Sequence, residues 1–496
     1  MDDEKGGTHN GEERSSGARD TLAKEVYGVG LTDVDTAIGD VRPLATDKFT
    51  AWNLKIRQWI AKAGAEEGGI ERVPPELRTN QPARDIFTLF MSANVGTATL
   101  AFGTLGPGLF YLGWWDSFLC LLFFNIIGSI PPALMATLGP KLGLRTMVCP
   151  RYSFGWWPAK IIAILNFLNQ LGWAMVNTIA GADILYDVGQ GKLPLSVAVL
   201  IIGLLAMIVG LIGYRFVHIY ERWSWIVMTI CFCIVAGFGA KHFVNVPWGS
   251  GPTETSSVLS FGTAIIGFQI SWAPIAADYA VYMRETTKPW KVFWWAFWGL
   301  FLSQFLIELL GAALMTTISG SPDFQAAYEN AGVGGLCGQI FVGYGTGVRN
   351  FGYFIETILS LSVVAVVIVN IYSLGLNVQV ISQTLLRIPR LIWSLLGGAV
   401  FLIAAVAGRS HLQTVMENFL DVIAYWLTPF LAIMFLEHIC FRRGYQYDID
   451  AWDNPKKLPV GIAAFFTFCV GTVLAILSMS QTWVSSNALE PNAPRI

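Results

Sequence analysis

Charge is scarce over most of this chain. The sequence holds 66 Lys, Arg, Asp and Glu residues, and 26 of them lie within residues 1–80. The other 416 residues carry only 40, about one in ten, against roughly one in four for an ordinary globular protein. A soluble protein of this size needs more charge to cover its surface. The composition therefore predicts a chain whose outer surface faces lipid.

Other scarce features exclude further classes of protein. The net charge of −2 gives no electrostatic basis for nucleic-acid binding. The seven cysteines include no CxxC pair, so the sequence predicts neither a disulfide framework nor a zinc site. The first 80 residues are polar and show no signal peptide. The 19 Trp and 32 Phe are in turn too many for a disordered chain.

Long apolar stretches begin after Arg84, each able to cross about 30 Å of hydrocarbon. Tryptophan pairs such as Trp114-Trp115 and Trp156-Trp157 stand at their ends, as is typical of membrane interfaces. The sequence therefore predicts an all-α polytopic membrane protein. Its eleven expected segments are 86–110, 115–138, 159–185, 194–213, 218–240, 258–283, 291–318, 350–379, 391–407, 415–440 and 459–480.

The cationic residues predict how the chain is oriented. With the N-terminus inside, the inner loops after the tail hold fifteen Lys and Arg and the outer loops hold four. Residues 1–80 are expected to form a cytosolic, mostly disordered tail, in which 51–63 could lie as an amphipathic helix on the membrane or on the protein. We assign 81–440 to a ten-helix transporter core, 441–481 to an additional transmembrane helix and 482–496 to a short C-terminal tail outside.

Two of the apolar segments carry residues that suit an interrupted helix. Segment 1 has small and polar residues at 92–99, and segment 6 contains Ser-Trp-Ala-Pro at 271–274. Pro274 cannot donate a backbone hydrogen bond. Interrupted helices are tolerated at membrane depth only around a cavity, and two of them five segments apart indicate an inverted-repeat transporter with a midplane site. Kinked packing helices are the alternative interpretation.

Several motifs resemble those of one known family. FGTAIIGFQISWAPIAADYAVYM (261–283) is similar to the sixth segment of nucleobase–cation symporter family one, within its fungal purine–cytosine permease branch. The stretches 143–160, 213–225 and 369–379 resemble further motifs of that family. The resemblance runs from about Arg84 to Trp483 and implies two inverted five-helix repeats with two extra helices. The family usually has twelve helices, whereas eleven are predicted here.

The resemblance implies a substrate site between segments 1, 3, 6 and 8. Carried over by motif, the candidate substrate-binding residues are Ser92, Asn94, Trp173, Asn177, Ser271, Trp272 and Asn370. Elementary chemistry agrees, because Trp173 and Asn177 are four apart and share a helical face. A planar base needs an aromatic surface, and an amide offers a donor and an acceptor together. Packing tryptophans and a helix-bonding asparagine are the alternative interpretation.

Proton coupling is favoured over sodium coupling. Sodium-coupled relatives use hydroxyl groups of segment 8, where this chain has Val363, Val364 and Ala365, and we expect the nearby Ser362 hydroxyl to lie off that position. Acids within the membrane are the candidate proton carriers, because each is costly there. They are Glu308, Glu356 and Asp183, although a structural role stays open for each. Asp278, at the inner end of segment 6, is expected to pair with Arg284 or another inner-loop arginine.

The resulting hypothesis is a plasma-membrane symporter that imports cytosine and/or purine bases (adenine, guanine, hypoxanthine) with protons by alternating access. No catalytic residues, metal site or cofactor are predicted, and the expected partners are the base and the lipid bilayer. The branch commonly has Asn and Pro where Val366 and Val369 stand here. That departure leaves uracil, allantoin, thiamine or vitamin B6 as alternative cargo. A non-transporting nutrient sensor or a truncated inactive paralogue is the second hypothesis. The sequence does not predict the oligomeric state.

Overall fold

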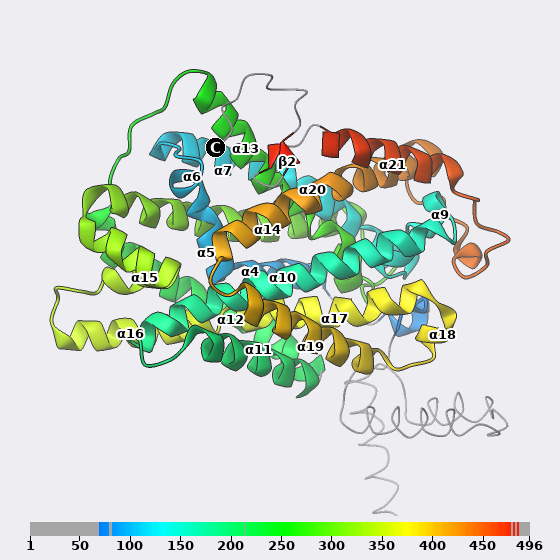
Figure 1. The fold of residues 1–496 in the computed structure, drawn as a ribbon. Coiled ribbons are helices and arrows are strands. Elements are labelled where there is room, and N and C mark those ends of the chain that lie inside the picture. Colours follow the sequence, from blue (N-terminus) through cyan, green and yellow to red (C-terminus); the bar gives the residue numbers. More distant parts are fainter. Residues whose placement is uncertain (1–68, 79–81, 213, 478–479, 482–483, 486–496) are drawn as a thin grey trace, which may run out of the picture.

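The structure is a computed structural model that describes residues 69–78, 82–212, 214–477, 480–481 and 484–485. Within these ranges the chain is a bundle of helices, and most of the long ones run side by side (Figure 1). The strands of the described part are two short antiparallel partners, β1 (Ser480–Gln481) and β2 (Val484–Ser485). The predicted all-α class is confirmed. The expected amphipathic helix at 51–63 lies outside the described residues.

Apolar helices stand at all eleven predicted positions. Eight helices of the described chain are long and apolar enough to span, one bent pair makes a ninth, and two shorter apolar helices complete the set. The main helices are α4 (Asp85–Asn94), α5 (Thr97–Gly103), α6 (Leu105–Gly108), α7 (Trp114–Ala136), α10 (Pro158–Val188), α11 (Leu195–Ile212), α12 (Tyr214–Gly239), α13 (Pro252–Ile270), α14 (Pro289–Thr316), α16 (Thr346–Ser360), α17 (Val363–Ile381), α19 (Arg390–Gly408), α20 (Leu412–Leu436) and α21 (Ile462–Leu477).

Shorter elements connect or continue these helices. They are η1 (Pro75–Leu77), α8 (Leu138–Leu142), η2 (Thr146–Val148), α9 (Arg151–Phe154), η3 (Ala240–His242), η4 (Ala273–Tyr279), η5 (Thr317–Gly320), α15 (Pro322–Gln339), α18 (Gln383–Leu386), the π-helical turn η6 (Glu437–Phe441) and η7 (Ile449–Ala451). Following the orientation that the cationic residues predict, we call the end with α15 the outer end and the end with α9 and α18 the inner end, at left and right of Figure 1.

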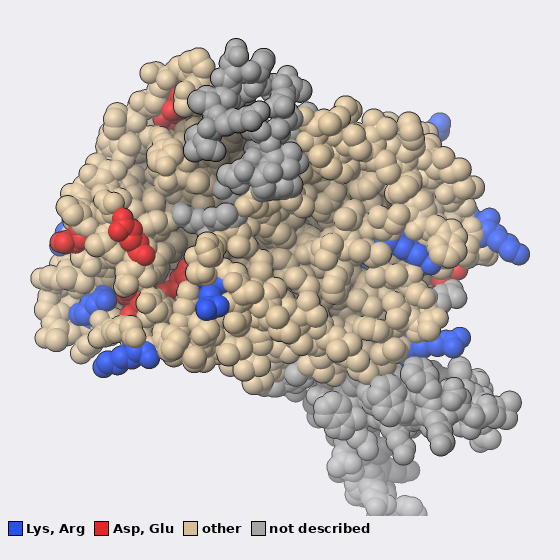
Figure 2. Space-filling view, viewed as in Figure 1, with Lys and Arg blue, Asp and Glu red and all other residues tan. Residues whose placement is uncertain are grey.

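The outer surface of the bundle is apolar. Large side chains such as Phe123, Leu168, Ile403 and Phe466 are exposed on α7, α10, α19 and α21. Figure 2 shows a face that is mostly uncharged, with Lys, Arg, Asp and Glu gathered toward the two ends. An exposed apolar belt between two charged ends is the arrangement that a bilayer requires. The chain is a multi-pass membrane protein.

Both predicted helix interruptions are present. Helix α4 ends at Asn94 and α5 begins at Thr97, and the two parts are bent by 65°. Helix α13 ends at Ile270, after which the chain continues as the 3-10 turn η4. Pro274 lies in the first turn of η4, where its missing N–H leaves no helical bond unmade. The small residues of segment 1 and the proline of segment 6 therefore do break these helices.

Segments five apart in the chain pack against one another. Helix α7 contacts α14, α10 contacts α17, and α11 contacts α19, which are segments 2 and 7, 3 and 8, and 4 and 9. The two broken segments meet as well, because Trp272 of segment 6 donates to Asn94 of segment 1. These pairings are those expected of two five-helix repeats arranged about a pseudo-two-fold axis.

Two glycines let segment 1 approach segment 7 at backbone distance. A Cβ added at Gly103 of α5 would lie 1.9 Å from the carbonyl oxygen of Glu308 in α14. A Cβ added at Gly311 of α14 would lie 2.0 Å from the carbonyl oxygen of Leu100. Small residues at such positions allow membrane helices to pack closely. Helices α5 and α14 therefore form one tightly packed pair.

We expect alanine at Gly103 or Gly311 to destabilise the fold by at least about 3 kcal/mol, because a backbone carbonyl cannot give way as a side chain tip can. The yield of monodisperse protein and its melting temperature in detergent measure the effect. Gly237 of α12, which has no atom within 4 Å of an added Cβ, is the matched control. Its alanine variant should be neutral or slightly more stable. Equal losses at all three glycines would contradict the proposed close approach.

Candidate functional site

A small pocket lies between the two broken helices. Its walls come from α4 and α5, α10, α13 with η4, and α17, which are segments 1, 3, 6 and 8. Its volume is about 20 Å³, room for little more than one water molecule. The lining residues are Ala93, Asn94, Thr99, Gln170, Trp173, Asn177, Phe268, Ser271, Trp272, Ile275, Val366 and Asn370.

The pocket brings together most of the residues that the sequence suggested. Six of the seven candidate substrate-binding residues line it, and Ser92 does not. The six are Asn94, Trp173, Asn177, Ser271, Trp272 and Asn370. Their contact with a substrate stays a prediction. Sequence reasoning missed Gln170, although its place one helical turn before Trp173 was a usable signal.

The Asn94 amide holds the two interruptions together. Its Oδ1 accepts hydrogen bonds from Trp272 Nε1 and from Gln304 Nε2 of α14, each at 3.0 Å. Its Nδ2 donates to the Phe90 carbonyl at 2.9 Å, so both ends of the amide are engaged. Trp272 also packs edge-on against Phe90, with ring centroids 5.4 Å apart. Asn94 therefore positions the Trp272 indole beside the pocket.

The second tryptophan is held by aromatic contacts. Trp173 meets Phe268 and Phe419 edge to face, with ring centroids 4.7 and 5.5 Å apart. Asn177 Nδ2 donates to the Trp173 carbonyl at 2.7 Å, which fixes that amide on the same helix. Ser271 Oγ donates to the Phe268 carbonyl at 2.6 Å. The pocket thus has two indoles whose orientations are set by neighbouring side chains.

Three buried polar atoms of the lining have no hydrogen-bond partner in the described part of the chain. They are Gln170 Oε1, Trp173 Nε1 and Asn370 Nδ2. A buried unsatisfied polar group costs on the order of 1–3 kcal/mol, so native proteins keep few of them without a purpose. None of the lining residues is ionisable. The arrangement suits a neutral, flat ligand that supplies both donors and acceptors.

Glu308 lies behind the pocket in a chain of amides. Its side chain is fully buried in α14, four residues after Gln304, and its Oε2 accepts from Asn125 Nδ2 of α7 at 2.6 Å. Asn125 Oδ1 in turn accepts from Gln269 Nε2 of α13 at 2.6 Å. The second carboxyl oxygen of Glu308 has no partner within the described ranges. Helix α14 therefore connects to both broken segments, through Gln304 and through Glu308.

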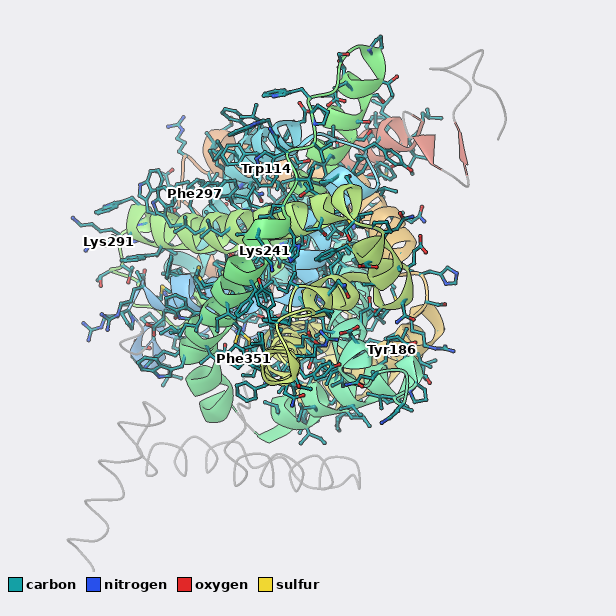
Figure 3. The ribbon with its side chains drawn as sticks, turned by 90° about the vertical axis from the view of Figure 1, so that its left-hand side faces the viewer. Trp114, Tyr186, Lys241, Lys291, Phe297 and Phe351 are labelled. Carbon is teal, nitrogen blue, oxygen red and sulfur yellow. The ribbon has the colours of Figure 1, made fainter. Side chains whose placement is uncertain are left out.

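The other two candidate acids lie at the outer end, away from the pocket lining. Glu356 of α16 is fully buried 3.7 Å from Arg349, whose other nitrogen lies 3.5 Å from Asp187. Asp183 lies on α10 beneath the glycine-rich part of α15, where an added Cβ at Gly334 would meet its carbonyl at 2.5 Å. Figure 3 views this end, where Trp114, Tyr186 and Phe351 mark α7, α10 and α16. Glu356 thus has a salt-bridge partner, unlike the amide-bonded Glu308.

Ser362 lies beside the break in segment 1. Its Oγ accepts a hydrogen bond from the Thr97 N–H at 3.1 Å, and so caps the first turn of α5. Val363, Val364 and Ala365, the residues that follow, are buried and supply no hydroxyl. The Ser362 hydroxyl is thus used by the fold itself at this point.

Arg145 ties the inner end together. Its buried guanidinium donates to the Gly69 carbonyl at 3.3 Å, to the Asp278 carbonyl at 3.0 Å and to Tyr282 Oη at 3.0 Å. The Asp278 carboxylate accepts from the backbone N–H and the hydroxyl of Thr146, at 2.6 and 3.1 Å. Segment 6 is thereby fastened to the turn between segments 2 and 3.

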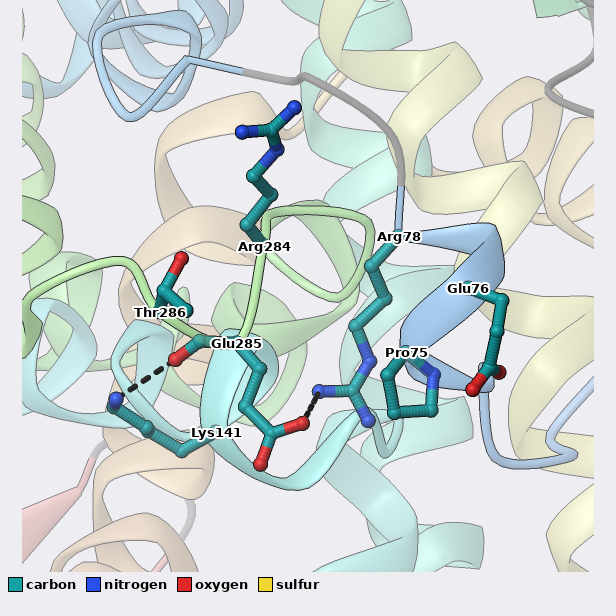
Figure 4. A pocket seen from close by; sticks show the side chains of 7 residues that line it. All are labelled: Pro75, Glu76, Arg78, Lys141, Arg284, Glu285 and Thr286. Carbon is teal, nitrogen blue, oxygen red and sulfur yellow. Dashed lines mark hydrogen bonds and ion pairs between the residues drawn. The ribbon is translucent and has the colours of Figure 1, made fainter.

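Residues 69–78 pack across this inner end, around Arg78. Its guanidinium donates to the carbonyls of Val73 at 3.0 Å and Pro140 at 2.8 Å, and its Nη1 lies 3.5 Å from a Glu285 carboxyl oxygen (Figure 4). Lys141 also donates to the Glu285 carbonyl at 2.8 Å. Burial lowers the pKa of Arg78 from its usual value. Arg78, Lys141 and Glu285 line a surface hollow at this end, and Arg284 lines it as well.

The fold and the pocket define a multi-pass membrane transporter built on an inverted repeat. A family described as permeases for cytosine/purines, uracil, thiamine and allantoin matches residues 72–489. The chain belongs to this family. It is a membrane transporter of small nucleobase-type molecules, and not an enzyme.

Curated relatives and solved structures agree with this assignment. The purine-cytosine permease fcyB of Emericella nidulans is 41% identical over 434 residues, covering 86% of this chain and 84% of that protein. The purine-cytosine permease FCY21 of Saccharomyces cerevisiae is 35% identical, covering 90% and 85%. The structure of Mhp1, a nucleobase-cation-symport-1 family transporter, closed with bromovinylhydantoin bound, superposes with a TM-score of 0.63 at 14% identity, covering 84% of this chain and 93% of that one. The expected five-plus-five transporter fold is confirmed.

We expect Arg78→Ala to lower the free energy of unfolding by at least about 2 kcal/mol, because buried carbonyl oxygens lose charge-assisted donors. Glu285→Gln should cost less than about 1 kcal/mol, since the Glu285 side chain is 45% exposed. Thermal unfolding in detergent compares the two variants. Equal losses would assign the stabilisation to the ion pair and not to the carbonyl oxygens.

Proposed function

We propose that this chain imports cytosine and purine bases together with protons, across the plasma membrane and by alternating access. The observation that carries the proposal is the uncharged pocket, in which unpartnered donors and an acceptor lie beside two fixed indoles. Bases carry such hydrogen-bonding edges and stack on aromatic rings, at roughly 1–3 kcal/mol per base. Two of the relatives are purine-cytosine permeases, which supports the same cargo.

The chemistry of the pocket favours neutral bases over the other cargo of the family. Thiamine carries a permanent positive charge, and the lining has no carboxylate to balance it. A charge without a partner is strongly disfavoured in a low-dielectric site. Val366 lines the pocket with an apolar side chain, so it adds shape and no hydrogen bond. Cytosine, adenine, guanine and hypoxanthine are therefore preferred to thiamine.

Alternating access suits the small volume of the pocket in this structure. A pocket of about 20 Å³ is too small for a base, so the helices around it must separate for loading. Arg145 and residues 69–78 cover the inner end, whereas Arg349 links α16 with α10 and α15 at the outer end. Opening one of these ends at a time gives inward or outward access. The excess of cations in the inner loops supports a cytosolic N-terminus.

Glu308 is the proposed proton carrier. It is buried and, in the described chain, has amide neighbours where Glu356 has an arginine. A carboxyl group in such a setting can take up and release a proton without breaking an ion pair. Its connection through Asn125 to Gln269 links it to α13, which ends at Ile270, two residues before Trp272. Proton coupling through Glu308 would therefore act on both broken segments.

Replacing Trp272 by alanine should weaken base uptake. Loss of the stacking face is worth about 1–3 kcal/mol, so the concentration for half-maximal uptake should rise roughly 5- to 150-fold. Uptake of labelled cytosine and adenine in cells without their own carriers measures it. Trp298→Ala is the matched control, because that indole is exposed on the lipid-facing side of α14. Unchanged uptake by Trp272→Ala would reject the site, and wild-type binding without uptake would favour a nutrient sensor.

Replacing Glu308 by glutamine should abolish proton-driven accumulation of bases while leaving their exchange across the membrane intact. One proton per base at 100 mV supplies about 2.3 kcal/mol, enough for roughly 50-fold accumulation. In proteoliposomes Glu308→Gln should exchange bases across the membrane yet stop at equal concentrations on both sides. Glu356→Gln is the comparison and should keep accumulation wherever it folds. Accumulation by Glu308→Gln at the wild-type level would exclude it as the carrier.

A further inference from the structure

Gln170 faces the pocket with an oxygen that nothing in the described chain satisfies. It lies on α10, lines the pocket and is 1% exposed. Its Nε2 donates to Asn166 Oδ1 at 3.2 Å, whereas its Oε1 is left without a partner. One end of this amide is therefore held by the protein, and the other is available to a ligand.

A set of amides beneath the pocket determines which end is free. Asn166 Oδ1 accepts from both Gln170 and Asn169, the latter at 3.3 Å. Asn166 Nδ2 donates to Asn377 Oδ1 of α17 at 3.0 Å. Because the Asn166 oxygen takes up the Gln170 N–H, the Gln170 oxygen is turned toward the pocket. The contact between α10 and α17 thus sets the polarity of the site.

The three free atoms of the lining are complementary to a base edge. Trp173 Nε1 and Asn370 Nδ2 are donors, and Gln170 Oε1 is the acceptor among them. Adenine and cytosine present ring acceptors and an exocyclic amino donor, and the free bases also carry a ring N–H. A ligand without a suitable donor would leave the Gln170 oxygen buried and unpaired, which polar sites discriminate against strongly.

We propose that Gln170 is a specificity-determining residue whose Oε1 accepts a hydrogen bond from an N–H of the bound base. Asn166 and Asn377 are positioning residues that keep this oxygen toward the ligand. The inference rests on the proposed base transport and adds the group that recognises the donor side of the cargo. It assigns a role to a side chain outside the motifs that pointed to the site.

The test combines ligand and protein changes. Adenine, purine (which lacks the amino group) and 9-methyladenine (which lacks the ring N–H) compete with labelled adenine for the full-length chain. In the wild type we expect adenine to bind at least about 10-fold better than one of the two analogues. In Gln170→Met, which has a similar length and no acceptor oxygen, that preference should fall below about 3-fold. An undiminished preference for adenine over both analogues would overturn the assignment.

Matched variants separate recognition from stability. Thr178→Val removes another unpartnered buried polar atom of α10 that does not line the pocket, and should keep the wild-type preference. Gln170→Glu, when protonated, retains a carbonyl acceptor and an O–H for Asn166, so it should restore most of the preference lost in Gln170→Met. Asn166→Leu should reduce the preference as Gln170→Met does. If Gln170→Met does not fold, loss of the preference in Asn166→Leu supports the proposal, and its retention overturns it.

The experiment also distinguishes this inference from the function on which it rests. A folded wild-type chain that binds neither adenine nor cytosine would reject the proposed cargo, and Gln170's role with it. A wild type that binds adenine, with the same preference in Gln170→Met, would reject only the role of Gln170.

Discussion

The site depends on the rule that backbone interrupted inside a bilayer must find partners within the protein. Here one side chain, Asn94, provides the central connection at the break in segment 1. Its amide reaches the indole of segment 6 and an amide of segment 7 while remaining bonded to its own helix. Ser362 caps the other half of the same break. Ser362 thus gives a partner to a backbone N–H at the break, while Asn94 ties the break to segments 6 and 7.

Features encoded within one segment could be predicted from the sequence. The lengths of the apolar stretches predicted the membrane-spanning helices. The small residues near Asn94 and the proline at Pro274 predicted the two helix breaks. The four-residue spacing of Trp173 and Asn177 placed them on one helical face. Features that arise only when separate segments pack could not be predicted. No pattern around Ser362 indicated that its hydroxyl would accept a hydrogen bond from Thr97, which is 265 residues away in the chain.

The inner end also shows the difference between features encoded within one segment and features that arise when segments pack. Asp278 was expected to pair with Arg284 or another arginine of the inner loops, and Arg145 does donate to its backbone carbonyl, but the two hydrogen bonds that Thr146 donates to its carboxylate could not be predicted. Composition could not show that residues 69–78 pack under the bundle, because Arg78 donates to the carbonyl of Pro140 in α8, 62 residues further along the chain. Gln170 was not predicted for a related reason. Its proposed role depends on its hydrogen bond to Asn166, which in turn is bonded to Asn377 of another helix.

The backbone contact at Gly103 and Gly311 has a mechanical consequence. Because main-chain atoms meet directly at these two glycines, we expect α5 and α14 to shift together as one rigid unit. Glu308 belongs to α14, and its own backbone carbonyl forms part of the contact with Gly103. A change of charge at this carboxyl group would thus act on α5 through the backbone contact, without a change of side-chain rotamer between the two helices. In the proposed proton coupling, the two glycines would thus convert a local change of charge at Glu308 into a movement of both helices.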